Sequence, residues 1–357
     1  MRYHHFEHFA PICPLCRRDH NVQVPLNLHV SNGNLDWIEE GHFHCQRCQA
    51  IYPVLRGIPI LVPNVGTYLE QSYVHTMWNT RFSSHHLQWL SEAAGPSSVV
   101  DNTRNYLSTY MWGHYGDLEP EPAKQDSNFL NILAHSKRDE LPKGNLLDLG
   151  CAVGRGTFWL AEQYERPVLG LDLNFAMLMH AQEVMRNGRV VYGQREVGTV
   201  YRWKEYEVSL PNTELVDFWV ADAMALPLQD QFIGAAISLN VLDCTTSPMS
   251  FLTELTRIAK EWHCFCPYDW SISITQFHEW IGGHNSFAEW NGRPEKILGY
   301  LLSENSPHPQ LQTTKIVHEL PEIPWRIRVH DRSMMEYLLH YIHVESGFSS
   351  MQNPSHQ

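Results

Sequence analysis

The sequence lacks any apolar run long enough to cross a bilayer, which takes about 18–20 residues. Its first residues, Met1 to His8, contain no apolar core of the kind found in a signal peptide. Charged residues are also scarce, at 18% of the chain against a usual share of about 25%. With 43% hydrophobic residues, the chain can bury a large core, which excludes global disorder. We therefore expect a cytoplasmic protein with no membrane partner.

Basic residues are few compared with acidic ones. The chain has 26 Lys and Arg against 39 Asp and Glu, a net charge of −13 with neutral histidines. A surface that binds a phosphate backbone usually makes its domain basic, so this balance argues against a broad nucleic-acid interface. The 22 histidines make the charge depend on pH, because protonating all of them would reverse its sign.

The length of 357 residues exceeds that of a typical single domain, about 100–150 residues. We expect one large α/β domain with a small accessory module and see no internal repeat or low-complexity tract. Changes in composition predict three parts. They are a module at 1–66, a helical linker and lid at 67–126, and the large domain at 127–357.

The eight cysteines are too sparse for a disulfide scaffold. Two C-x-x-C pairs, Cys13 with Cys16 and Cys45 with Cys48, suit tetrahedral zinc, although the gap between them exceeds the common ribbon spacing of about 15–20 residues. Four thiolates leave no open position, so this zinc would be structural. Disulfides and unpaired buried thiols are the alternatives. Without a metal, a module of this size has too little core to fold.

Strand and helix signals alternate from residue 145 onward, which is typical of a parallel sheet with crossover helices. An earlier segment at 67–92 has helical spacing, and residues 95–126 have the composition of a loop or lid, before a helix capped by Ser127. The long segment 195–215 predicts an inserted hairpin. Strands are expected at 145–149, 168–172, 216–221, 235–240, 262–266, 312–319 and 337–344, and helices at 155–165, 174–187 and 248–260.

The strongest chemical signal is a glycine loop between a strand and a helix, Asp-Leu-Gly-Cys-Ala-Val-Gly-Arg-Gly at 148–156. Its glycines let the backbone turn sharply and lie close to a ligand, but their order differs from the G-x-G-x-x-G of dinucleotide sites. Asp172 ends the next strand, where a carboxylate can accept both hydroxyls of a ribose. Asp222 ends a third strand, where an adenine edge would pass. The alternative is a turn needed only for strand–helix packing.

This constellation resembles the class I methyltransferases that use S-adenosylmethionine. The resemblance covers about residues 127–350 and implies a doubly wound, Rossmann-like α/β sheet. It also implies that the glycine loop wraps the methionine part of the cofactor, that Asp172 holds the ribose, and that Asp222 takes the adenine amine. The implied cofactor-binding residues are Asp148, Gly150, Cys151, Gly154, Gly156, Asp172, Leu173, Asp222, Ala223 and Asn240.

The cysteine segment resembles the small zinc-ribbon activator subunit of tRNA and protein methyltransferases. The shared features are the two cysteine pairs and a trailing Tyr-Pro-x-x-x-Gly-Ile-Pro pattern at 52–59. The resemblance implies a structural Zn²⁺ on Cys13, Cys16, Cys45 and Cys48, and a surface through which a protein partner could dock.

The substrate side is expected after the fourth and fifth strands of the sheet. There, Tyr268 and Asp269 could hydrogen-bond a polar substrate and accept a proton, while Trp270 and Trp280 wall the pocket. The alternative makes the tryptophans ordinary core residues and Asp269 a solvated turn residue. The base could also be a nearby histidine.

These segments resemble the methyltransferase part of ovothiol-biosynthesis enzymes, which methylate a ring nitrogen of a mercaptohistidine. The shared features are Leu-Asn-x-Leu-Asp at 239–243, Pro-Tyr-x-Trp at 267–270, and the Trp-x-Gly-Gly at 280–283. The chain departs from that group in three ways. It has a cysteine module in place of an iron-dependent portion, it has Asp269 where a threonine is expected, and it lacks the Pro-Gly-Gly turn.

The leading hypothesis is therefore methyl transfer from S-adenosylmethionine to a heteroatom (N, S or O) of a small polar metabolite, such as an imidazole or amino-acid derivative. An RNA methyltransferase that uses the ribbon for docking is the alternative. A non-catalytic partner protein is the third reading, but it has no need of an intact glycine loop.

Overall fold

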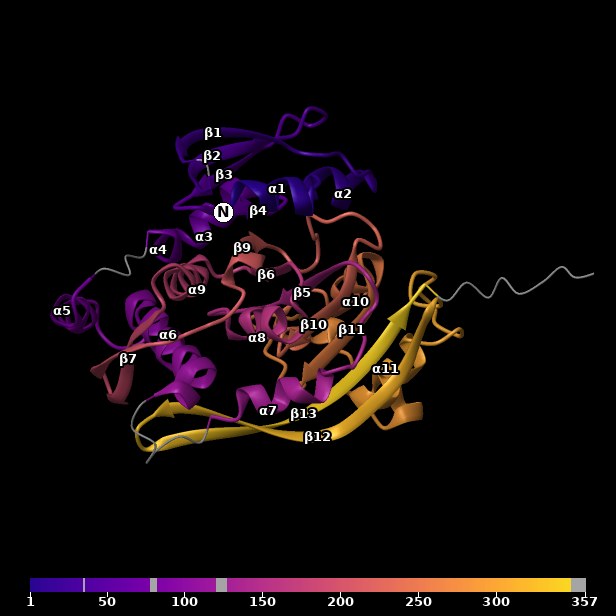
Figure 1. Cartoon of the computed structure of the whole chain (residues 1–357). Coiled ribbons are helices and arrows are strands. Elements are labelled where there is room, and N and C mark those ends of the chain that lie inside the picture. Colours follow the sequence, from indigo (N-terminus) through magenta and orange to yellow (C-terminus); the bar gives the residue numbers. More distant parts are fainter. Residues whose placement is uncertain (35, 78–81, 120–126, 348–357) are drawn as a thin grey trace, which may run out of the picture.

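The computed structural model describes residues 1–34, 36–77, 82–119 and 127–347. Its central element is an eleven-stranded sheet that joins the N-terminal segment to the large domain (Figure 1). The strand order is β1-β2-β3-β4-β9-β6-β5-β10-β11-β13-β12, so the chain winds outward from β5 in both directions. The parallel part consists of β5 (Asn145–Leu149), β6 (Val168–Asp172), β9 (Val216–Ala221), β10 (Ile233–Leu239) and β11 (Ala259–Cys266).

Helices cover both faces of the parallel strands, which explains why those strands are almost continuously apolar. One apolar core contains the buried faces of α8 (Arg155–Tyr164) and α9 (Phe175–Asn187), and the other contains those of α10 (Pro248–Ile258) and α11 (Pro294–Leu301). The sequence sets the ends of α9: Asn174 accepts from the backbone N–H of Ala176, and Gly188 ends the helix at φ 61°. The predicted doubly wound α/β sheet is confirmed.

A long antiparallel hairpin completes the sheet beyond β11. It consists of β12 (Thr314–His330) and β13 (Ser333–Ser346), and β13 pairs with β11. Both strands were expected, but each extends well past its predicted range. Figure 1 shows the hairpin in yellow reaching beneath α6 (Val99–Tyr115) and α7 (Phe129–Leu133).

The N-terminal segment extends the same sheet at its other edge. Its last strand pairs in parallel with β9, with Ile60 opposite Val220 and Leu61 opposite Ala221. His5 adds a buried bond from its Nδ1 to Oδ2 of Asp217 at 3.0 Å. The elements of this segment are α1 (Tyr3–Phe9), α2 (Pro14–His20), β1 (Asn27–Gly33), β2 (Ile38–His44), β3 (Ile51–Leu55) and β4 (Ile58–Leu61).

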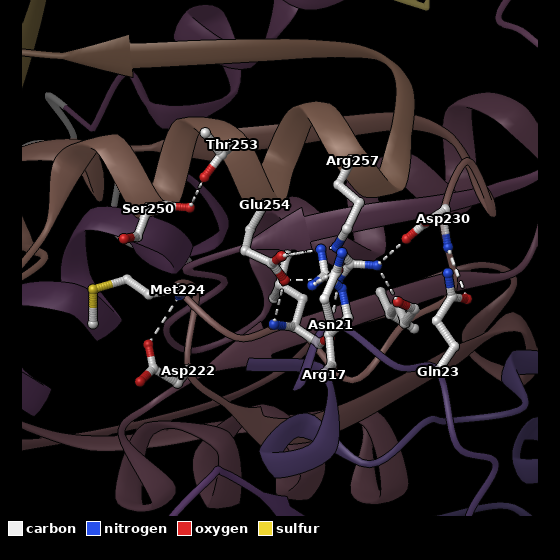
Figure 2. A network of polar contacts seen from close by, with 12 residues as sticks. Arg17, Asn21, Gln23, Asp222, Met224, Asp230, Ser250, Thr253, Glu254 and Arg257 are labelled. Atoms are coloured by element: carbon white, nitrogen blue, oxygen red, sulfur yellow. Dashed lines mark hydrogen bonds and ion pairs between the residues drawn. The ribbon is translucent and has the colours of Figure 1, made fainter. Parts of the chain in front are cut away.

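A polar network joins α2 to α10 (Figure 2). The carboxylate of Glu254 accepts two bonds from Arg257, at 2.8 and 2.7 Å, and one from the backbone N–H of Leu226 at 2.9 Å. Arg17 of α2 lies 3.5 Å from the same carboxylate. Because Leu226 lies in the segment that follows β9, this network connects the N-terminal segment to the loop that begins at Asp222.

The prediction of a loop at 95–126 is wrong for most of the residues that the structure describes there. Residues 99–118 form α6 and a short 3₁₀ helix, η1 (Gly116–Leu118). Ser98 caps α6 by accepting from the N–H of Asp101, and Met111 and Trp112 are buried in the core. Ser127 is not a cap; its hydroxyl donates to the carbonyl of Gly113. Residues 120–126 lie outside the described residues.

The helix predicted at 67–92 is divided into three, and its residues 78–81 lie outside the described residues. The inserted hairpin is confirmed but begins earlier than predicted.

Among the described helices, none combines the length and apolarity needed to span a membrane. The remaining elements are α3 (Val65–Gln71), α4 (Tyr73–Thr76), α5 (Ser84–Ala94), β7 (Arg189–Val197), β8 (Val200–Glu207), and the 3₁₀ helices η3 (Ala134–Ser136), η4 (Thr213–Leu215), η5 (Leu242–Cys244), η6 (Phe277–Glu279) and η7 (Asn285–Trp290).

Candidate active site

A cavity of about 600 Å³ lies at the carboxyl ends of β5, β6, β9 and β10. This is the point where the strand order reverses, the usual ligand site of an open α/β sheet, and the volume lies in the usual range of about 300–1,000 Å³. The predicted cofactor residues that line it are Gly150, Asp172, Leu173, Asp222, Ala223 and Asn240.

The backbone of Gly150 forms part of the wall of this cavity. Its φ of 81° is left-handed, and its N–H donates to the carbonyl of Leu171 at 2.7 Å. A Cβ at this position would lie 2.1 Å from Cγ2 of Val241. Only glycine therefore fits here, and its backbone forms part of the cavity wall.

Gly154 and Gly156 are not among the residues that line the cavity, and their surroundings favour a packing role. A Cβ on Gly154 would lie 2.7 Å from Cζ of Phe218, and one on Gly156 would lie 2.7 Å from Oδ2 of Asp148. Both glycines let α8 pack closely against the sheet. The glycine loop thus combines the two readings that the sequence left open, a ligand contact at Gly150 and tight packing further on.

Asp148 and Cys151 lie behind the loop, beside a void of only about 20 Å³. Asp148 accepts from the hydroxyl of Thr157 at 2.8 Å, and its burial raises the pKa of the carboxyl to about 7. Burial likewise raises the pKa of the Cys151 thiol. The two side chains support the loop without lining the larger cavity.

Asp172 and Asp222 project into the cavity from neighbouring strands. Asp172 accepts from the N–H of Asn174 at 2.7 Å and from that of Ala152 at 2.9 Å, and Asp222 accepts from the N–H of Met224 at 2.9 Å. Burial raises the pKa of both carboxyls. Backbone bonds hold each carboxylate in place, and a carboxylate has about four acceptor positions, so each can still accept from a ligand.

Asn240 follows β10 with a left-handed φ of 59°, a conformation maintained by its N–H bond to the carbonyl of Phe265 at 2.8 Å. Its side-chain Oδ1 is buried without a hydrogen-bond partner among the described residues. A buried acceptor in this state needs a donor, and a polar ligand in the cavity can supply one.

A second pocket of about 240 Å³ lies between α6 and the β12–β13 hairpin. Tyr110 and Asn240 line both this pocket and the first cavity, so the two adjoin there. Trp325 and Tyr337 add aromatic walls, and His114 lines it with a pKa that burial lowers to about 3, which leaves its imidazole neutral.

The sequence reasoning missed this pocket because it treated α6 as a loop. Tyr106, Tyr110 and His114 recur at every fourth position, the spacing of one helical face, and all three line the pocket. That spacing is the signal that could have identified them.

Tyr268 and Asp269 line neither cavity among the described residues. The hydroxyl of Tyr268 bonds to Nδ1 of His340 at 2.5 Å, and Nε2 of His340 bonds to Glu319 at 2.8 Å. Burial raises the pKa of Tyr268. Asp269 lies beside Tyr337, and burial together with this carboxylate raises the pKa of Tyr337 to about 12.

The tryptophans that follow are stacked, with the ring centroids of Trp270 and Trp280 6.2 Å apart. Trp280 donates from Nε1 to the carbonyl of Thr275 at 2.9 Å. Neither tryptophan is among the residues that line the two cavities, and of this segment Asp269 lies beside Tyr337, which lines the second pocket.

The four N-terminal cysteines lie together. Sγ of Cys13 is 3.6 Å from that of Cys48, and Sγ of Cys16 is 3.7 Å from that of Cys45. Ligands at the usual Zn–S distance of about 2.3 Å on a tetrahedron are about 3.8 Å apart. These separations fit four zinc thiolates and are too long for disulfides, whose S–S bond is about 2.05 Å. The long gap between the pairs is occupied by the β1–β2 hairpin.

Comparison with known proteins identifies the chemistry of the large domain. Residues 147–262 match the family described as "Methyltransferase domain", a range that starts in β5 and contains Gly150, Asp172, Asp222 and Asn240. This is an S-adenosylmethionine-dependent methyltransferase domain of class I. The predicted methyltransferase family and α/β fold are thereby confirmed. The resemblances to the zinc-ribbon subunit and to the ovothiol enzymes, the residue roles and the three-part division stay predictions.

Two curated relatives are methyltransferases. Cycloartenol-C-24-methyltransferase 1 of Oryza sativa subsp. japonica is 26% identical over 196 residues, which cover 51% of this chain and 49% of the relative. Phosphoethanolamine N-methyltransferase 1 of Zea mays is 29% identical over 130 residues, which cover 33% and 23%. The chain thus spans about half of the first relative and about a quarter of the second.

A similar solved structure is geranyl diphosphate C-methyltransferase from Streptomyces coelicolor A3(2), in complex with Mg²⁺, geranyl diphosphate and S-adenosyl-L-homocysteine. It has a TM-score of 0.41 and 9% identity, over 71% of this chain and 100% of that chain.

The cavity of the methyltransferase domain fits S-adenosylmethionine. A Cβ at Gly150 would push against Val241, which also lines the cavity, and the buried Oδ1 of Asn240 needs a donor. The carboxylates of Asp172 and Asp222 suit ribose hydroxyls and an adenine amine. Tyr110 extends from α6 over the junction with the second pocket.

Proposed function

We propose that this protein transfers a methyl group from S-adenosylmethionine to a nitrogen, sulfur or oxygen atom of a small polar molecule. The observation that carries the proposal is the junction of the two cavities at Tyr110 and Asn240. A cavity of about 600 Å³ suits the cofactor, and the adjoining pocket of about 240 Å³ suits a small acceptor.

In this proposal the chain works mainly by positioning. The bound cofactor supplies a methyl group on a sulfonium, which a lone pair can attack directly. Asp172 accepts from the ribose, Asp222 accepts from the adenine amine, and Gly150 lets the backbone approach the ligand. Alignment of two reactants can supply effective molarities of about 10⁵ M or more. The α6 helix and the β12–β13 hairpin exclude water from the acceptor.

The lining of the smaller pocket favours a flat acceptor with a free lone pair. Tyr106, Tyr110, Trp325 and Tyr337 offer ring faces, and His114 is neutral and a poor base. An acceptor that enters as an ammonium would need a stronger base than this histidine. An imidazole ring nitrogen or a thiolate meets the requirement, which agrees with the predicted imidazole or amino-acid derivative.

We keep Tyr268 and Asp269 as proposed contributors to catalysis, acting through the residues that they contact. Asp269 supports Tyr337, and Tyr268 forms a chain with His340 and Glu319. This support favours a positioning role for both over direct proton abstraction. A base is needed only for an acceptor that is protonated at the working pH.

The N-terminal segment that carries Cys13, Cys16, Cys45 and Cys48, which we call the ribbon, is proposed to be a structural zinc module. Its four sulfur atoms lie within 4.8 Å of one another, which suits Zn²⁺. Because β4 already pairs with β9, a protein partner would meet the outer strand β1 instead. A cytoplasmic location and the absence of a nucleic-acid partner stay proposals that rest on composition.

The test is a screen for methyl acceptance that measures S-adenosylhomocysteine formation with imidazoles, thiols, amines, a sterol and structured RNA. We expect turnover with an imidazole or a thiol. The Tyr337→Phe variant should bind the cofactor normally but use the acceptor less well. Turnover with RNA alone would support the alternative RNA methyltransferase, and turnover with the sterol alone would contradict heteroatom transfer.

A further inference from the structure

A second group of potential metal ligands lies far along the chain from the cysteines. It consists of Glu261 and His263 on β11 and His343 on β13, which face each other across the antiparallel strand pair. The three side chains are buried, with exposed fractions of 7%, 1% and 0%. Buried polar groups of this kind are normally hydrogen-bonded, so their partners can be checked one by one.

The atoms that point into the group have no hydrogen-bond partner among the described residues. They include Oε1 of Glu261, Nε2 of His263 and Nε2 of His343. Each imidazole Nε2 lies 3.6 Å from a carboxylate oxygen of Glu261, beyond the usual hydrogen-bond range of about 2.7–3.2 Å. Leaving such groups buried and unbonded costs stability, so the separation requires an explanation.

The spacing matches that of ligands around one metal ion. Two ligand atoms at about 2.1 Å from a tetrahedral metal are about 3.4 Å apart. Nε2 of His263 lies 3.6 Å from Oε1 of Glu261, and Nε2 of His343 lies 3.6 Å from Oε2, so the carboxylate lies near the ligand distance from both nitrogens. All three ligand atoms lie within 4.8 Å of one another. Two imidazole nitrogens and a carboxylate form a donor set that suits Zn²⁺ and neighbouring first-row metals.

His263 also has the second contact typical of a metal-bound histidine. Its Nδ1 lies 2.8 Å from the hydroxyl of Tyr341, which fixes the ring and leaves Nε2 facing His343 and Glu261. Such outer contacts orient ligands and fix their tautomer. The rings of His263 and His343 are stacked and nearly parallel, with centroids 4.3 Å apart and an angle of 13° between them. To share an ion with His263, the His343 ring has to turn, and neither of its nitrogens has a hydrogen-bond partner among the described residues to prevent this.

We propose that Glu261, His263 and His343 bind a divalent metal ion of the zinc type, with the fourth position available to water. The two ligands on β11 lie within the strand rather than at its carboxyl end, and none of the three ligands lines either cavity, so the ion is separate from the methyl-transfer site. It ties β13 to β11. The same hairpin carries Trp325 and Tyr337, so the ion fixes the base of the element that walls the acceptor pocket.

The experiment loads metal-stripped full-length protein with Co²⁺ and counts bound metal per chain after gel filtration. Wild type should bind one more equivalent than Glu261→Gln, a substitution that keeps the shape of the side chain. The control His278→Gln changes an exposed histidine and should match wild type. Equal metal content in wild type and Glu261→Gln would overturn the proposal.

The cobalt absorption spectrum is the second measurement. The equivalent lost in Glu261→Gln should carry ligand-field bands without thiolate charge transfer, because its ligands are nitrogen and oxygen. The thiolate charge-transfer band of the four-cysteine site should persist and report that the variant is folded. Should the variant unfold, wild type alone decides: a spectrum with sulfur-ligated cobalt only would overturn the proposal.

Discussion

The ribbon and the cofactor cavity both depend on tight turns, but the turns serve different ends. In the ribbon, four buried or half-buried cysteines converge within 4.8 Å. In the cavity, Gly150 and Asn240 hold left-handed backbone conformations beside an open volume of about 600 Å³. Damage to the ribbon should therefore cost stability, and damage to the cavity should cost binding.

The largest expected effect separates the two regions by stability. Cys16→Ser should remove the proposed zinc and destabilise the ribbon, because structural zinc contributes about 10–16 kcal/mol in isolated zinc fingers. Thermal unfolding and zinc analysis measure this. The control Cys244→Ser removes an exposed thiol and should leave both unchanged. A Cys16→Ser protein with full zinc content would contradict the ribbon assignment.

The next effect concerns binding. Gly150→Ala should abolish S-adenosylhomocysteine binding, because its Cβ would overlap Val241 at 2.1 Å and its φ is 81°. Gly95→Ala is a matched control, since Gly95 has φ 83° and nothing within 4 Å of an added Cβ. The control has ψ 167°, a backbone conformation that essentially only glycine adopts, so it should lose about 1–3 kcal/mol of stability and bind normally. Isothermal titration distinguishes the variants. Normal binding by Gly150→Ala would contradict the claim that ligand binding requires glycine at this position.

A smaller effect tests the link between the regions shown in Figure 2. Glu254→Gln removes the charge that receives Arg257 and Arg17 and weakens the bond from Leu226. We expect a loss of about 1–3 kcal/mol in the free energy of unfolding, measured by denaturant titration. S-adenosylhomocysteine affinity should fall only slightly, because Asp222 keeps its bond to Met224. A large loss of affinity without a loss of stability would place Glu254 in the site itself.

The last effect develops only as the pH changes. Burial raises the pKa of Asp148 to about 7, against 3.8 for the free side chain. A carboxyl with a raised folded pKa is stabilising below the unfolded pKa, and that stability is lost as pH rises through the folded value. Wild type should lose stability relative to Asp148→Asn between about pH 4 and pH 8, by at most a few kcal/mol. A constant difference over that range would contradict the raised pKa.

Most of the large domain could be predicted from local patterns. The strands around Leu147 and Leu169 are short and mostly apolar, and the helix ends at Asn174 and Gly188 follow ordinary capping chemistry. The positions of Asp172 and Asp222 at strand ends could be predicted too, since parallel strands end at one edge of the sheet.

Other features depend on contacts between distant segments. The pairing of Leu61 with Ala221 joins strands far apart in the chain, and no local pattern encodes it. Tyr110 enters the site only because α6 lies against the hairpin, and the Gly, Asn and Tyr content of that region suggested a loop. The meeting of His263 with His343 likewise depends on the register of β11 and β13.

The most direct test of the central claim is isothermal titration of the full-length protein with S-adenosylhomocysteine. We predict saturable binding of one ligand per chain at micromolar affinity. Asp172→Ala should lose at least about 100-fold in affinity through two charge-assisted bonds, and the exposed control Asp139→Ala should bind like wild type. The absence of any heat with folded wild-type protein would contradict the account.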